Sequence, residues 1–175
     1  MKVSLALLIF LTPVVFGQNQ ADNPAPGGCG QPSVHFVVQT GKRNHPTPVP
    51  GSGKAIVYFI QDDTHFLANP RPTTRIGIDG NWIGATRATS YLFQVVEPGE
   101  HHLCASWQSS HGFNVENTAA AAHLTAEAGH AYYFLIENSY RFEPRIPAEV
   151  RLTRVDSDEG ELLASKSLLS SSHPR

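Results

Sequence analysis

The stretch at residues 73–108 constrains the fold most, because its alternating apolar segments are separated by two tight-turn signals. Asp79-Gly80 is the dipeptide typical of a two-residue type I′ turn, and alternating residues flank it on both sides. A second turn signal, Glu97-Pro98-Gly99-Glu100, joins the apolar run 91–96 to another alternating segment. The pattern predicts two successive β-hairpins and therefore a β-meander.

The rest of the chain adds strand signals and one helix signal. Residues 54–60 are apolar at nearly every position, which indicates a central strand covered on both faces. Asp156 is placed as the N-cap of a short helix that ends near Lys166. Further strands are expected at 34–39, at 120–125 and 130–137 as a hairpin, and at 149–155. About eight short strands and one C-terminal helix predict an all-β fold, an antiparallel β-sandwich or open barrel.

The length of 175 residues suits one domain of ordinary size once a targeting segment is removed. Residues 1–17, with Lys2 before an apolar run, have the pattern of a secretory signal peptide, with cleavage expected after Gly17 or Ala21. We expect a flexible leader at 18–31, a β-sandwich at 32–166 and a frayed tail at 167–175. The protein is therefore expected to be exported, periplasmic or extracellular, without a membrane span.

Two cysteines, Cys29 and Cys104, are read as a disulfide because an exported protein folds in an oxidising compartment. The bridge would close a loop of about 75 residues, worth roughly 4 kcal/mol on the chain-entropy model. Two independent free thiols are the alternative. The net charge of −2 leaves no basic field for nucleic acid.

Residues able to carry chemistry do not form a known catalytic pattern. Histidine is the enriched type, with nine. Adjacent His101 and His102 point to opposite faces of a strand, whereas His123 and His130 could face each other across a hairpin and supply two metal ligands at most. The loop that holds Asp62, Asp63 and His65 is a further candidate for metal binding. We expect no cofactor, no catalytic residues and no enzyme activity; a metal-dependent hydrolase is the least favoured alternative.

Aromatic side chains offer a second alternative, a small-ligand or glycan-binding module. Most aromatic residues fall at inward-facing positions of the predicted strands, where they would be core. Trp82, Trp107 and Tyr140 are the candidate ligand-binding residues, together with the polar loop at 61–72.

Five ordered blocks between Gly53 and Ser165 carry a resemblance to a known family. They are GKAIVYFIQ, TTRIGIDGNWIGA, YLFQVVEPGEHHLCASWQ, LTAEAGHAYYF and VDSDEGELLAS. With these blocks the chain resembles the exported bacterial domain of unknown function DUF2846, and it is more weakly similar to PEGA-type modules. The resemblance implies a β-sandwich outside the cytoplasm and no known activity. The expected function is a non-enzymatic structural or interaction module of the cell envelope, with an unidentified protein or glycan partner.

Overall fold

A computed structural model describes residues 27–41, 46, 48, 51, 53–64, 66, 69–108, 118–140 and 148–175. This part of the chain forms ten strands and one helix. Their bounds are β1 Phe36–Thr40, β2 Ala55–Asp62, β3 Thr73–Ile78, β4 Asn81–Arg87, β5 Ser90–Val96, β6 Gly99–Trp107, β7 Ala119–Ala126, β8 Ala131–Ser139, β9 Glu149–Val155, α1 Ser157–Lys166 and β10 Leu168–Pro174. The predicted signal peptide and most of the predicted leader lie outside the described residues.

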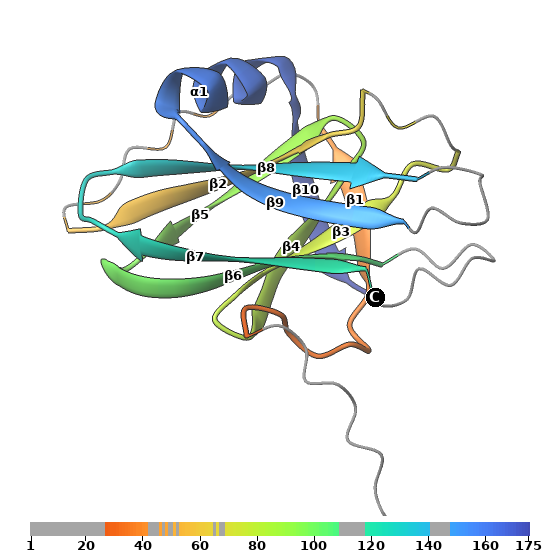
Figure 1. The fold of residues 1–175 in the computed structure, drawn as a ribbon, viewed down its shortest axis with the longest axis horizontal. Coiled ribbons are helices and arrows are strands. Elements are labelled where there is room, and N and C mark those ends of the chain that lie inside the picture. The colour runs from red at the N-terminus through yellow and green to blue at the C-terminus, as the bar shows by residue number, and fades with distance from the viewer. Residues whose placement is uncertain are drawn as a thin grey trace, which may run out of the picture.

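The strands form two sheets that stack as layers (Figure 1). One sheet has six strands in the order β1-β10-β5-β2-β8-β9, and the other has four in the order β4-β3-β6-β7. The predicted β-sandwich with a short C-terminal helix is confirmed. The described residues form ten strands instead of about eight. The pairing is also not antiparallel throughout, because β2 with β8 and β10 with β5 are parallel pairs.

The central position of β2 follows from its composition. Its side chains alternate between the two faces of the sheet, so an unbroken apolar run requires cover on both. Phe59 belongs to the main core between the sheets, whereas Tyr58 belongs to a second cluster beneath α1. The predicted central strand is therefore confirmed, with β5 and β8 as its neighbours.

The first predicted hairpin is confirmed, and the second is wrong. β3 pairs with β4 across Asp79-Gly80, and Asp79 has the positive φ of 50° that such a turn requires. By contrast, β5 pairs with β2 and β10, whereas β6 pairs with β3 and β7. The turn after β5 carries the chain from one sheet to the other. β5 is apolar on both faces at Tyr91 and Leu92, and both side chains are buried, one in each core cluster.

The hairpin expected between 120–125 and 130–137 is wrong for a similar reason. β7 pairs with β6, and β8 pairs in parallel with β2. Three consecutive residues of β8, 132 to 134, are buried, which suits an inner strand, whereas β7 has an exposed residue at every second position from Ala121 onward. The short turn between β7 and β8 therefore carries the chain from one sheet to the other instead of closing a hairpin.

The predicted frayed tail is also wrong, because residues 168–174 form β10 between β1 and β5. Ser170 is buried, and its Oγ donates a hydrogen bond to Ala85 O at 2.7 Å. Ser172 Oγ accepts a hydrogen bond from Ala85 N at 2.9 Å. Serine hydroxyls thus help to hold β10, and its sequence lacks the alternating apolar side chains that predict a strand.

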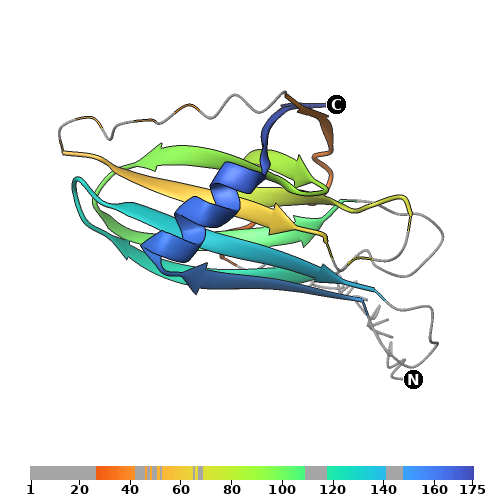
Figure 2. The same cartoon turned by 90° about the horizontal axis from the view of Figure 1, so that it is seen from above.

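The helix α1 lies across the outer face of the six-stranded sheet, over β2 and β8 (Figure 2). Its predicted start is confirmed, because Asp156 Oδ1 accepts a hydrogen bond from Glu159 N at 2.9 Å. Gly160 weakens the helix signal in the sequence, but the packing of the helix against the sheet explains its presence. A Cβ at this position would lie 2.2 Å from Tyr133 Cγ, so only glycine lets the helix approach the sheet this closely.

The end of the predicted leader packs against the four-stranded sheet. Cys29 forms the predicted disulfide with Cys104 of β6, which is fully buried. Gly28 and Gly30 are buried as well, and a Cβ on Gly28 would lie 2.5 Å from His102 O. The prediction of flexibility therefore fails for residues 27–31, whereas 18–26 lie outside the described part.

Candidate functional site

The three candidate ligand-binding aromatics do not form one exposed platform. Trp107 is buried, and its ring meets the ring of Phe66 edge to face, with centroids 6.0 Å apart. Tyr140 is half-buried beside the same Phe66, at 6.4 Å. Trp82 lies on the other side of the molecule's core, on the outer face of the four-stranded sheet. Trp107 belongs to the core, so the three candidate side chains do not line one exposed surface.

Trp82 has a structural partner in the segment that follows the disulfide. Its Nε1 donates to Gln31 O at 2.7 Å, and the guanidinium of Arg75 lies 4.6 Å from its ring centroid. Arg75 Nη1 in turn donates to Pro32 O at 2.8 Å and to Val34 O at 3.0 Å. Burial lowers the pKa of Arg75. Together with the disulfide, these two side chains fix residues 29–34 on the sheet.

A buried polar network lies where the loop at 61–72 meets both sheets. Asp63 Oδ2 accepts from Gln61 Nε2 at 2.6 Å, and Asp63 Oδ1 accepts from Asn138 Nδ2 at 3.0 Å. Asn138 Oδ1 accepts a hydrogen bond from Trp107 Nε1, and Gln61 Oε1 accepts from Thr86 Oγ1 at 2.7 Å. The buried side chains of this network therefore satisfy one another.

The environment of Asp63 shifts its pKa. Burial raises its pKa, while hydrogen bonds from Asn138 and Gln61 and the positive charge of Arg71 act in the opposite direction without cancelling the shift. A raised carboxyl pKa is common at functional sites, but structural networks produce it too. Here both carboxylate oxygens have protein partners, which favours a structural role. His65, the third member of the predicted loop cluster, lies outside the described residues.

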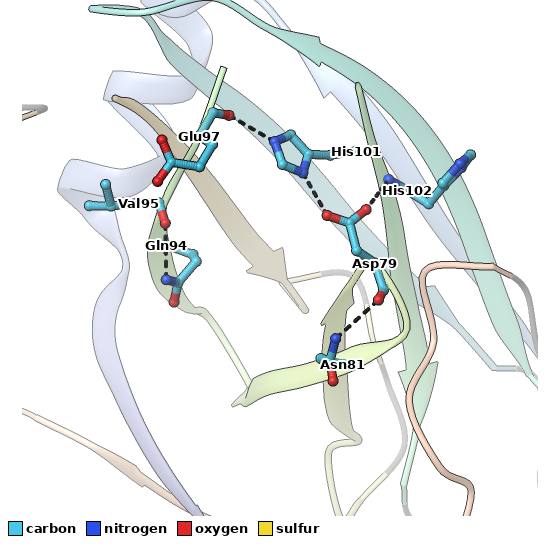
Figure 3. Close-up of polar contacts among 7 residues, drawn as sticks. All are labelled: Asp79, Asn81, Gln94, Val95, Glu97, His101 and His102. Atoms are coloured by element: carbon cyan, nitrogen blue, oxygen red, sulfur yellow. Dashed lines mark hydrogen bonds and ion pairs between the residues drawn. The ribbon is translucent and has the colours of Figure 1, made fainter. Parts of the chain in front are cut away.

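A second polar junction surrounds Asp79, the first residue of the turn after β3 (Figure 3). Asp79 Oδ2 lies 2.7 Å from His101 Nδ1, and Asp79 Oδ1 accepts from His102 N at 2.8 Å. His101 Nε2 lies 2.8 Å from Glu97 O. The side chain of His101 is 12% exposed. The junction thus joins the β3–β4 turn to β6 and to the turn between the two sheets.

The protonation of this junction follows from its geometry. Burial raises the pKa of Asp79, but hydrogen bonds from His101 and from the His102 N–H, with the charges of both imidazoles, lower it overall. An ionised carboxylate and a carbonyl oxygen are both acceptors. His101 therefore makes both of its hydrogen bonds when both ring nitrogens carry protons. This arrangement positions a turn, and both carboxylate oxygens of Asp79 and both ring nitrogens of His101 already have a partner.

The histidines pair differently from the expectation. As expected, the rings of His101 and His102 point to opposite sides of β6 (Figure 3). His123 faces His102 and not His130, because β7 pairs with β6. The ring centroids of His102 and His123 are 5.5 Å apart. His130 is exposed, and its Nδ1 lies 3.2 Å from Ala128 O. The prediction that His123 and His130 face each other is wrong.

An open pocket of about 450 Å³ lies at the start of α1, beside β8 and β9. The guanidinium of Arg154 lies 4.9 Å from the ring centroid of Tyr132 there. Residues 131–133 and 154–157 line the pocket. Asp156 is engaged as the helix cap, so Arg154 is the charged side chain that remains available to a ligand in it.

Among the described residues, no group of three or more His, Cys, Asp or Glu side chains is arranged to hold a metal ion. No helix of the described part is long and apolar enough to cross a membrane. Comparison of the chain with protein-family models, curated proteins and solved structures gives no match.

Proposed function

We propose that the protein is an exported, non-enzymatic β-sandwich that acts as a structural or interaction module of the bacterial cell envelope. We also propose that it belongs with the DUF2846 domains, on the sequence blocks quoted above. The main support is the disulfide between Cys29 and Cys104. Disulfides persist in oxidising compartments such as the periplasm and are rare in the cytosol. The signal-peptide pattern of residues 1–17 agrees with that location.

The hydrogen bonds that the polar side chains make within the protein support a non-catalytic role. A catalytic acid, base or nucleophile must reach a substrate. Asp63 and Arg75 are buried and bonded to protein groups. Asp79 and His101 bond to each other and to backbone groups of neighbouring turns. In each case the hydrogen bonds of the polar side chain join a loop or turn to a sheet, although Nε of Arg75 has no hydrogen-bond partner among the described residues.

The location of the disulfide suits an envelope protein in another way. It ties a segment at residue 29 to a strand 75 positions later. Closing a loop of that length stabilises the fold by about 4 kcal/mol on the chain-entropy model. Such added stability suits an exported module.

Export and oxidation can be tested together on the full chain expressed in a bacterium. Cell fractions are separated, denatured and alkylated, and the chain is analysed by mass spectrometry. We expect a periplasmic or secreted chain that begins at Gln18 or Asp22, with neither cysteine alkylated. The Cys29→Ala variant is the matched control, because it should be exported as well and should show one alkylated thiol. A full-length chain that stays in the cytoplasm with both thiols alkylated would contradict the proposal.

A further inference from the structure

His102 and His123 lie directly opposite each other on neighbouring strands. β6 and β7 run side by side (Figure 1), and their register places His102 against His123. The next residues along the two strands, Leu103 and Leu124, are buried in the core between the sheets. Because side chains alternate along a strand, both histidines point to the opposite, outer face. Both are exposed.

The two rings differ from the neighbouring His101 in what they contact. Both nitrogens of His101 lie within 2.8 Å of an acceptor. Within the part of the chain that the structure describes, the side chains of His102 and His123 have no hydrogen-bond partner, and their contact is with each other. Each ring therefore has a free nitrogen lone pair in its neutral form, which is the form that binds metals.

The distance between the rings is close to the one that a shared metal ion requires. A metal bound about 2.0–2.1 Å from one nitrogen of each ring, at an angle of about 90° to 110°, holds the two ring centroids about 4.6 to 5.3 Å apart. The observed separation of 5.5 Å lies just outside that range. The two exposed side chains must rotate to close this difference.

The backbone beneath the pair is held from several sides. Cys104, two residues after His102, is disulfide-bonded. The N–H of His102 donates to Asp79 Oδ1 at 2.8 Å. Eight register pairs join β6 to β7. Because the backbone is already fixed, metal binding has to order only the two side chains. On the same face Glu100 is a diagonal neighbour of His123, and its negative charge favours a cation.

We propose that His102 and His123 form a surface site for a divalent transition-metal ion of the copper(II) class. Each histidine supplies one nitrogen, and water completes the coordination. Imidazole ligands suit copper, nickel and zinc, and among these copper(II) binds a given nitrogen site most tightly. The open positions make the ion exchangeable. This site goes beyond the proposed structural or interaction role.

The test uses the untagged, oxidised chain and copper(II) as the probe, since a histidine tag would bind the metal itself. Isothermal titration gives affinity and stoichiometry, and electron paramagnetic resonance reports the number of coordinated nitrogens. The variants are His102→Thr and His123→Thr, singly and together, because threonine is favoured at exposed strand positions. His130→Thr is the matched control. Circular dichroism without metal shows whether each variant folds.

The wild type and His130→Thr should bind copper(II) with two imidazole nitrogens. Either single variant should bind it about 100-fold more weakly, because the second ligand of a chelate acts at high effective concentration. Equal binding by the wild type and the folded double variant would overturn the proposal. It would also fail if each single variant kept its affinity and lost only part of the stoichiometry, which would mean two independent histidines.

Discussion

Asp63 shows how a single side chain connects the loop after β2 with both sheets. It bonds to Gln61 of β2 and to Asn138 of β8. Asn138 also donates to Thr74 Oγ1 of β3 at 3.3 Å, which lies in the other sheet. Because each of these groups is buried, each needs its partner. The network thus fixes the spacing of the layers at this end of the sandwich.

The Asp63→Asn variant should be less stable, and its deficit should grow as the pH falls. An amide oxygen can replace one carboxylate oxygen, but the amide nitrogen then faces a donor, which costs about 1–3 kcal/mol. Because burial raises the pKa of Asp63, the folded state binds its proton more tightly than the unfolded state does. The contribution of Asp63 to the stability of the wild type therefore increases as the pH falls from above its pKa in the folded state toward the ordinary pKa of an aspartate.

Urea unfolding of both proteins between pH 7 and pH 4 measures the effect. Carboxylates elsewhere, such as Asp79, act the other way because a lowered pKa loses stability on acidification, but they act equally in both proteins. The difference between the two curves therefore isolates Asp63. Parallel curves across the whole range would show that the charge state of Asp63 is unrelated to stability.

The sequence predicts features that involve one short segment or a pair of residues, but it misses networks whose members lie far apart in the chain. The Asp156 cap, the Asp79-Gly80 turn and the pairing of Cys29 with Cys104 were all predictable. The sequence places Asp63 in a polar loop, but of its two side-chain partners only Gln61 is near it in the chain, and Asn138 is 75 residues away. No spacing in the chain indicates that Asn138 lies beside it.

At the scale of elements, β10 is the clearest difference from expectation. Its sequence, LLSSSHP, lacks an apolar alternation, and polar residues at a chain end are usually frayed. The strand is held instead by backbone pairing with β1 and β5 and by serine hydroxyls that bond to Ala85 of β4. Hydrogen bonds between a side chain and a distant backbone group leave no periodic signal.

Ending the chain after Ser167 should therefore destabilise the whole sandwich. β1 would lose its partner in the sheet, and buried groups of β4 and β5 would lose theirs, at about 1–3 kcal/mol for each unpaired group. We expect the free energy of unfolding to fall by more than about 3 kcal/mol on that basis. A chain that lacks Arg175 alone keeps β10 and should stay within about 1 kcal/mol of the wild type. Equal melting of the wild type and both truncated chains would contradict the role of β10.

For the whole molecule, the sequence predicted the class of fold but not the path of the chain through it. A Pro-Gly turn after β5 and a short turn after β7 are compatible with a hairpin and with a crossing between layers. Whether each turn closes a hairpin or crosses between the layers depends on which strands are covered on both faces. β5 and β8 are buried on both faces and take inner positions, whereas β7 takes an edge. That decision depends on the core as a whole.

The same topology determines which histidines meet. A hairpin of β7 with β8 would have brought His123 toward His130, on the pattern expected from the sequence. Because β7 instead pairs with β6, His123 faces His102, and the proposed metal site depends on that pairing. Both the fold and the inferred site therefore depend on this path of the chain.

Backbone nuclear Overhauser effects in the isotopically labelled, oxidised protein show which strands are neighbours and in which direction they run. We predict antiparallel contacts between β6 and β7, including His102 with His123, and parallel contacts between β2 and β8, including Phe59 with Phe134. An antiparallel ladder between β7 and β8, with no contacts from β7 to β6, would contradict the account.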